Sequence, residues 1–182
     1  MKSSTPTLKL NLPTALTLSR LFLIPVFLWV AQHHHPLAGA AVFTLASMTD
    51  WLDGYLARKM GSVTKFGIIM DPIADKFLVI SALVLLVHLD EVSFWIAAVL
   101  IAREFAVTAI RVVALSKGTI MPAEMGGKLK TVFQFCAIVC LVIDGSNFGG
   151  FHDIGTDLIW VALGLSVFSG VKYTLSFRRT TA

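Results

Sequence analysis

The chain has 182 residues, of which 56% are hydrophobic and only 14% are charged. A soluble domain of this size and composition would expose too much apolar surface, so the composition favours the lipid bilayer as its solvent. A spanning helix needs about 20 apolar residues, which leaves room for about six spans and no separate soluble head. We therefore expect one all-α integral membrane domain over residues 1–182, in which residues 1–12 could lie along the membrane interface.

Six apolar blocks follow one another along the chain and predict six transmembrane helices. They cover Thr14–Gln32, Leu37–Leu56, Asp71–Leu89, Val92–Leu115, Leu129–Ile143 and Ile154–Phe177. The connections after the first, third and fifth blocks contain no Lys or Arg, so all 15 basic residues belong to the other connections, the termini or the span ends beside them. By the positive-inside rule, both termini should face the cytoplasm, as expected for a multi-pass protein of the cytoplasmic (inner) membrane. This topology also explains the net charge of +4 without a nucleic-acid partner.

Four aspartates occupy positions where the second and third spans should be apolar. Asp50 and Asp53 stand near the end of the second span, and Asp71 and Asp75 stand at the start of the third. Spacings of three and four residues place each pair on one helix face. Four carboxylates at one membrane face repel one another unless cations compensate them, and such oxygen ligands suit Mg²⁺ or Mn²⁺ together with phosphate oxygens. The four aspartates are therefore candidate metal ligands.

Each aspartate taken alone has a simpler explanation. Asp71, which precedes Pro72, could be a helix N-cap with proline in the first turn, and Asp53 could mark an ordinary span end. The combination is harder to explain in this way. Gly54 and Gly67 flank the carboxylates, and small residues let helices and a bulky ligand approach closely.

The spacing of these residues forms a longer pattern. The pattern Asp50-x2-Asp53-Gly54-x2-Ala57-Arg58-x8-Gly67-x3-Asp71-x3-Asp75 resembles the signature of the CDP-alcohol phosphatidyltransferase family at all eight of its positions. The resemblance implies a six-helix membrane fold, usually homodimeric, with the active site at the cytoplasmic ends of the second and third helices. It also implies transfer of a phosphatidyl group from CDP-diacylglycerol to an alcohol, with release of CMP.

The resemblance and the chemistry of phosphoryl transfer together suggest roles for the aspartates. Asp50, Asp53 and Asp71 would hold a pair of Mg²⁺ or Mn²⁺ ions, and Asp75 would complete the second metal site. The resemblance further implies that Asp75 is the general base that takes the proton of the acceptor alcohol.

The remaining residues of the pattern would contact CDP-diacylglycerol. Gly54, Ala57 and Gly67 would let the nucleotide approach, and Arg58 would donate to a phosphate oxygen, although it could also be a positive-inside anchor. In the first span, Thr17 and Arg20 could contact the nucleotide or headgroup. Alternatively, the Arg20 side chain could extend to the membrane interface.

Basic residues outside the shared pattern suggest an acceptor that carries a phosphate. Arg103 and Arg111 lie eight residues apart within the fourth span, and we expect them to share a helix face. Glu104 offers only one partial partner for them, which leaves surplus positive charge. Lys128 and Lys130 follow at the start of the fifth span, where they could bind the acceptor phosphate or could be flanking charges.

The stretches around these basic residues, and the segment from Asn11 to Pro25, are similar to members of the family that use sn-glycerol 3-phosphate. Ser19 and Glu124 depart from that pattern. The resemblance implies glycerol 3-phosphate as the acceptor and phosphatidylglycerophosphate as the product, with inositol phosphate, serine or phosphatidylglycerol as alternative acceptors.

Two other functional classes are weaker explanations of the aspartates. A divalent-cation transporter could also place aspartates in the membrane, but the second and third spans are apolar toward the outer face and would block an ion path. A non-catalytic scaffold gives no reason for four converging carboxylates. The sequence therefore favours the transferase.

Overall fold

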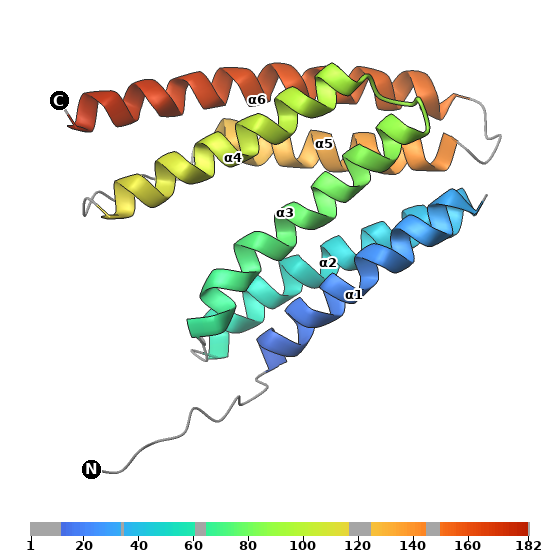
Figure 1. The fold of residues 1–182 in the computed structure, drawn as a ribbon, viewed down its shortest axis with the longest axis horizontal. Helices are drawn as coiled ribbons and strands as arrows, with labels where there is room; N and C mark the ends of the chain where they lie inside the picture. Colours follow the sequence, from blue (N-terminus) through green and yellow to red (C-terminus); the bar gives the residue numbers. More distant parts are fainter. Residues whose placement is uncertain (1–11, 34, 61–64, 117–124, 145–149, 182) are drawn as a thin grey trace, which may run out of the picture.

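The structure, a computed structural model, describes residues 12–33, 35–60, 65–116, 125–144 and 150–181. For residues 12–18, 20, 50–60, 65–75, 115–116, 125 and 178–181 it describes only the course of the backbone. The described residues form six α-helices and contain no strand (Figure 1). The helices are α1 (Leu12–Gln32), α2 (Pro36–Met60), α3 (Lys65–His88), α4 (Phe94–Ser116), α5 (Met125–Asp144) and α6 (Phe151–Thr181). The prediction of an all-helical chain is confirmed. The expected interfacial segment, residues 1–12, lies almost entirely outside the described residues.

The helices extend beyond the apolar blocks at several ends, because backbone hydrogen bonding continues through polar residues once a helix has formed. The largest difference is at α3, which begins at Lys65 rather than at Asp71. Asp71 is therefore its seventh residue, and the N-cap interpretation of Asp71 is wrong. Asp53 and Gly54 likewise lie inside α2, which continues to Met60, so they do not mark its end.

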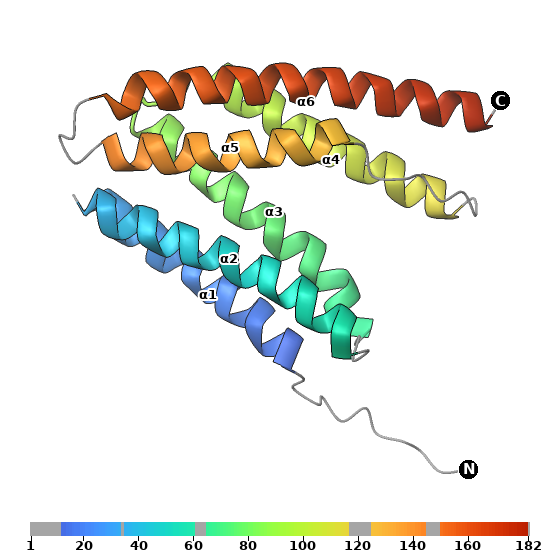
Figure 2. The ribbon, with the colours of Figure 1, turned by 180° about the vertical axis from the view of Figure 1, so that it is seen from behind.

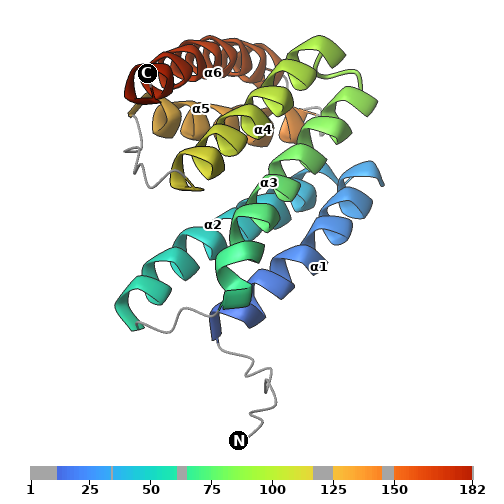
Figure 3. The same cartoon turned by 60° about the vertical axis from the view of Figure 1, so that its left-hand side comes forward.

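The six helices form two groups joined by α3. Helices α1 and α2 lie side by side, and α4, α5 and α6 form the second group (Figure 1, Figure 2). Helix α3 runs diagonally between the groups and contacts α1 and α2 on one side and α4 and α5 on the other (Figure 3). This arrangement brings the aspartate-bearing helices α2 and α3 together, and places α3 beside the helices that carry Arg103 and Lys130.

The core holds the two groups together through aromatic stacking. The Phe43 ring on α2 lies 5.4 Å from the Phe27 ring on α1 and 5.2 Å from the Phe135 ring on α5. Phe27 and Phe43 are completely buried, and Leu86 and Ile138 extend the same cluster. Phe43 thus contacts both α1 and α5, and it helps to hold the α1–α2 pair against the second group.

Two glycines allow neighbouring helices to approach closely. A Cβ atom on Gly39 of α2 would lie 2.9 Å from the Ala31 Cβ on α1. A Cβ atom on Gly155 of α6 would lie 2.6 Å from the Leu141 Cγ on α5. Real Cβ atoms do not approach so closely, so both helix pairs depend on the missing side chain.

The surface of the bundle is apolar over much of its length. Among the described residues, the stretches Gly126–Asp144 and Phe151–Phe177 are long and apolar enough to cross a membrane. Shorter apolar stretches cover Leu21–Gln32, Pro36–Thr49 and Lys76–His88. Large apolar side chains are exposed on several helices, including Phe22, Trp29, Trp95, Phe105, Trp160 and Phe168. Exposure of this kind suits a surface that faces lipid or another protein.

Candidate active site

The four aspartates lie on two helices that contact each other. Asp50 and Asp53 belong to α2, and Asp71 and Asp75 belong to α3. All four lie in the halves of the helices next to the connection between α2 and α3, about two to three turns from the helix ends. Their side chains are outside those that the structure describes, so their role as metal ligands stays a prediction.

The residues expected to bind the donor lie on the same helices and on α1. Gly54, Ala57 and Arg58 belong to α2, Gly67 belongs to the first turn of α3, and Thr17 and Arg20 belong to α1. Helices α1 and α2 both contact α3. The backbone therefore places these positions on three adjoining helices, while their side-chain contacts lie outside the described residues.

A cluster of charged side chains lies where α3, α4, α5 and α6 meet. Glu104 on α4 is its centre: its carboxylate accepts hydrogen bonds from the Lys130 ammonium on α5 and, at 3.2 Å, from the guanidinium of the neighbouring Arg103. Lys76 on α3 donates to the Glu104 carbonyl oxygen at 3.3 Å. We call Lys76, Arg103, Glu104 and Lys130 the basic cluster.

Helix α6 completes the setting of Arg103. The guanidinium donates to the Ser166 carbonyl oxygen at 3.1 Å and to the Ser169 hydroxyl at 2.6 Å. A Cβ atom on Gly170 would lie 3.3 Å from the Arg103 Cγ, so the absence of a side chain at Gly170 leaves room for the aliphatic part of Arg103. The contacts of Ser166, Ser169 and Gly170 were not predicted, because the sixth span has no diagnostic motif. Small residues at this spacing in an apolar helix could have indicated a close contact with another helix.

The basic cluster is largely shielded from solvent and carries more positive than negative charge. The side chains of Lys130, Arg103 and Glu104 are 3%, 14% and 23% exposed. The described residues of the cluster include three cationic side chains, Lys76, Arg103 and Lys130, and the single carboxylate of Glu104. Buried charges are costly unless they are compensated, so the surplus favours an anionic ligand.

Polar atoms near the basic cluster have unused hydrogen-bonding capacity. Gln134 lies one turn after Lys130 on α5, and Tyr173 lies one turn after Ser169 on α6. Within the described part of the chain, the Gln134 Nε2, Tyr173 hydroxyl and Ser166 hydroxyl are buried and have no hydrogen-bond partner. Buried polar groups almost always have a partner, so a ligand or water in this region would satisfy them.

Arg111 and Lys128 lie apart from these contacts. Both residues are exposed, whereas Arg103 and Lys130 are turned inward. A spacing of eight residues leaves Arg111 rotated by about 80° around α4 from Arg103, which explains why the two side chains do not share the face that we expected. Their role in acceptor binding stays a prediction.

The aspartate segment and the basic cluster are adjacent on α3. Lys76, which contacts Glu104, directly follows Asp75 in the chain. Consecutive Cα atoms are about 3.8 Å apart, so the backbone of Asp75 lies at the edge of the basic cluster. The backbone thus places the segment that carries the predicted metal ligands Asp71 and Asp75 directly before Lys76, a member of the basic cluster.

Several known proteins are similar to this chain. A profile of the CDP-alcohol phosphatidyltransferase family matches residues 10–171. A CDP-diacylglycerol–glycerol-3-phosphate 3-phosphatidyltransferase of Bacillus subtilis is 42% identical, over 90% of this chain and 93% of the relative. A probable phosphatidylglycerophosphate synthase of Mycobacterium tuberculosis is 41% identical, over 90% of this chain and 79% of the relative. A 3-phosphatidyltransferase of Haemophilus influenzae named for the same substrates is 36% identical, over 91% of this chain and 92% of the relative. The chain belongs to the CDP-alcohol phosphatidyltransferase family.

Proposed function

We propose that the protein transfers the phosphatidyl group of CDP-diacylglycerol to sn-glycerol 3-phosphate, producing phosphatidylglycerophosphate and CMP. The observation that supports the proposal is the contact of Lys76, the residue after Asp75 on α3, with the Glu104 carbonyl oxygen on α4, because the Glu104 carboxylate pairs with the cations Arg103 and Lys130. An acceptor with a hydroxyl at one end and a phosphate at the other matches this arrangement. The names of the relatives in Bacillus subtilis and Haemophilus influenzae support the same substrates.

The acceptor phosphate would bind at the basic cluster. Arg103 is held by Ser166 and Ser169, so its guanidinium is oriented before the ligand arrives. Lys130 is nearly fully buried and adds a second positive charge from α5. Arg111 and Lys128 would attract the acceptor from the exposed surface. Serine lacks a phosphate for this cluster, and the larger ring of inositol phosphate would need more space between the cluster and Asp75.

The donor would bind along α2 and the start of α3. Arg58 would donate to a pyrophosphate oxygen, while Gly54, Ala57 and Gly67 would let the cytidine nucleotide approach the helix backbones. Thr17 and Arg20 on α1 would contact the nucleotide or headgroup from the neighbouring helix. The two acyl chains would remain in the bilayer, which agrees with the apolar exposed surface.

The donor set of Asp50, Asp53, Asp71 and Asp75 fits hard divalent ions, because it offers four carboxylates from two helices in contact. We propose that these residues hold two Mg²⁺ or Mn²⁺ ions per active site. When bound, the ions would neutralise the charge that develops on the pyrophosphate oxygens.

In the reaction, Asp75 would accept the proton of the acceptor hydroxyl. The hydroxyl oxygen would then form a bond to the phosphorus of the phosphatidyl group. The bond between that phosphorus and the oxygen shared with CMP would break, and CMP would leave with the electron pair. The basic cluster would hold the phosphate of the acceptor in place while Asp75 works at its other end.

We further propose that all six helices span the cytoplasmic membrane, with both termini and the active site on the cytoplasmic side. The absence of Lys and Arg from the connections after the first, third and fifth apolar blocks, together with the exposed apolar side chains of the helices, supports this topology. We propose a homodimer as the working form, as the family resemblance implies. Cysteine labelling from each side of intact cells tests the topology, and light scattering of detergent-purified protein tests the dimer.

The reaction is tested with purified protein in detergent, CDP-diacylglycerol, Mg²⁺ or Mn²⁺, and a panel of acceptors, measured by CMP release. We expect release with glycerol 3-phosphate and little release with serine, inositol phosphate or phosphatidylglycerol. A preference for another acceptor would overturn the acceptor assignment only. Absence of release with every acceptor would overturn the transferase proposal.

A further inference from the structure

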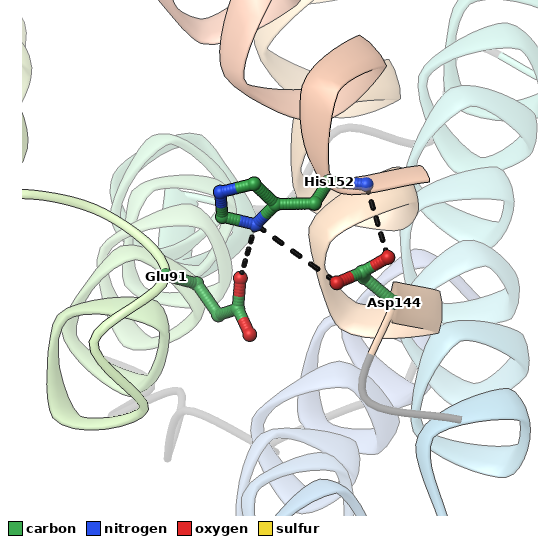
Figure 4. A group of neighbouring side chains, drawn as sticks. All are labelled: Glu91, Asp144 and His152. Carbon is green, nitrogen blue, oxygen red and sulfur yellow. Dashed lines mark hydrogen bonds and ion pairs between the residues drawn. The ribbon is translucent and has the colours of Figure 1, made fainter. Parts of the chain in front are cut away.

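Glu91, Asp144 and His152 form a second group of possible metal ligands, at the end of the bundle that holds the turn between α3 and α4 (Figure 4). They come from three segments: Glu91 from the turn between α3 and α4, Asp144 from the last residue of α5, and His152 from the first turn of α6. One ligand atom of each residue lies within 4.8 Å of the other two. His152 is separated from Ser166 of α6 by 14 residues, or about 20 Å along the helix, so this group is distinct from the proposed active site.

The side chains of this group point toward one another. The His152 Nδ1 lies 2.8 Å from the Glu91 Oε2 and 3.9 Å from the Asp144 Oδ2 (Figure 4). Ligands at about 2.1 Å from a tetrahedral Zn²⁺ ion are about 3.4 Å apart, a value between these two distances. Small rotations of the Glu91 and His152 side chains would therefore place all three atoms around one ion.

The backbone helps to orient the group. The His152 backbone N–H donates to the Asp144 Oδ1 at 3.0 Å, which leaves the Asp144 Oδ2 directed at the imidazole. Glu91 is held in a tight turn, where its N–H donates to the Leu86 carbonyl at 2.9 Å and Asp90 has a positive φ of 60°. Second contacts of this kind fix ligand orientation in metal sites.

We propose that Glu91, Asp144 and His152 bind a divalent transition-metal ion of the Zn²⁺ type. An imidazole nitrogen with two carboxylate oxygens suits Zn²⁺ better than Mg²⁺, which prefers oxygen ligands alone. The carboxylate side chains are 22% exposed and the imidazole is 50% exposed, so an ion can enter and water can supply a fourth ligand. A bound ion would join the α3–α4 turn to the adjoining ends of α5 and α6 and stabilise that end of the bundle.

The test is a Zn²⁺ titration of the full chain in detergent, with saturating Mg²⁺ present throughout so that the aspartates of the active site are occupied. At a Zn²⁺ concentration 100 times its Kd, we expect the unfolding midpoint to rise by about 5–10 °C. His152→Ala should lose one bound Zn²⁺ per chain and most of this rise. X-ray absorption of the Zn²⁺-loaded protein should show an imidazole ligand that the His152→Ala protein lacks.

Two further variants separate metal binding from the hydrogen bond between His152 and Glu91. Glu91→Gln keeps an acceptor oxygen for the imidazole N–H but removes the charge, so Zn²⁺ affinity should fall by at least about tenfold while the fold is retained. Asp153→Asn removes an exposed neighbouring charge outside the group and should leave Zn²⁺ binding unchanged. Absence of Zn²⁺ binding by the unaltered chain, or equal Zn²⁺ binding by the His152→Ala protein, would overturn the proposal. Neither result depends on enzymatic activity.

Discussion

The Arg103 guanidinium of α4 donates to the Ser169 hydroxyl of α6 at 2.6 Å. The same guanidinium donates to the Ser166 carbonyl oxygen, so two atoms of α6 fix its plane. Arg103 also donates to Glu104, and both Lys130 and Lys76 donate to Glu104 as well. Helix α6 therefore helps to order a cluster whose residues belong to α3, α4 and α5. A helix without any residue of the family pattern thus contributes to the proposed acceptor site.

Ser169→Ala removes the hydroxyl partner of Arg103. A hydrogen bond to a charged group contributes about 1.5–3 kcal/mol, but Arg103 retains its contact with the Ser166 carbonyl, so we expect the KM for glycerol 3-phosphate to rise by roughly three- to tenfold. The KM for CDP-diacylglycerol should change little. Steady-state CMP release with each substrate varied in turn measures both constants. Thr174→Ala is the matched control, because the Thr174 hydroxyl bonds only to the Gly170 carbonyl of its own helix among the described contacts.

Arg103→Lys keeps the positive charge but loses the planar donors that contact Ser166, Ser169 and Glu104. We expect the acceptor KM to rise by roughly tenfold or more, because an ammonium group cannot replace these directed hydrogen bonds. Arg111→Lys, made at an exposed position of the same helix, should have a much smaller effect. An equal rise in the acceptor KM for both variants would contradict acceptor binding at the basic cluster.

Glu104→Gln leaves Arg103 and Lys130 without their carboxylate. Loss of one partner of a buried ion pair destabilises strongly, and since the Glu104 side chain is 23% exposed we expect a loss of about 1–3 kcal/mol in unfolding free energy. Thermal unfolding in detergent measures the loss. Glycerol 3-phosphate should stabilise the Glu104→Gln protein more than the unaltered protein, because its phosphate would replace the missing negative charge. Stabilisation that is the same in both proteins would contradict phosphate binding at this cluster.

Asp75→Asn removes the proposed general base while keeping a side chain of similar size. We expect kcat to fall by at least about 100-fold, since a positioned base contributes that much or more. Binding of CDP-diacylglycerol, measured by calorimetry, should be largely retained. Equal loss of turnover and of donor binding would show instead that Asp75 acts chiefly as a metal ligand. Asp157→Asn, an exposed change near the start of α6, is the control for loss of one carboxylate.

Removal of divalent metal should abolish CMP release, and Mg²⁺ or Mn²⁺ should restore it. Asp50→Asn and Asp53→Asn should each raise the Mg²⁺ concentration needed for half-maximal activity by at least about tenfold, because each removes a proposed ligand. The measurement is a Mg²⁺ titration of activity after chelation. Full activity in the presence of excess chelator would contradict the metal-dependent mechanism.

The sequence predicted the helices well where the apolar blocks define them, and less well where polar residues continue a helix. The second apolar block ends at Leu56, but α2 continues to Met60. The third apolar block begins at Asp71, but α3 begins at Lys65. Polar residues such as Arg58 and Lys65 have adequate helix propensity, so nothing in their chemistry ends the helix. The aspartates consequently lie farther inside their helices than the apolar blocks indicated.

The spacing of the aspartates in the candidate site could be predicted from the sequence, whereas the contacts between helices in the basic cluster could not. The spacing from Asp50 to Asp75 is a property of the chain itself and could be recognised directly. The burial of Lys130 and the hydrogen bond from Arg103 to Ser169 depend on how α4, α5 and α6 pack. Arg103 and Ser169 are 66 positions apart in the sequence. Lys130 could equally have been a flanking charge, and only its contact with Glu104 distinguishes the two interpretations.

Gly155 has a consequence for how related sequences can vary. Any side chain at this position would meet both the side chain of Leu141 and its backbone nitrogen, the latter at 3.2 Å from a new Cβ. A change to alanine at 155 is therefore tolerable only together with a smaller residue at 141 and a slight separation of the two helices. Among homologous chains, residue size at these two positions should covary inversely, and Leu141→Ala should recover part of the stability that Gly155→Ala loses.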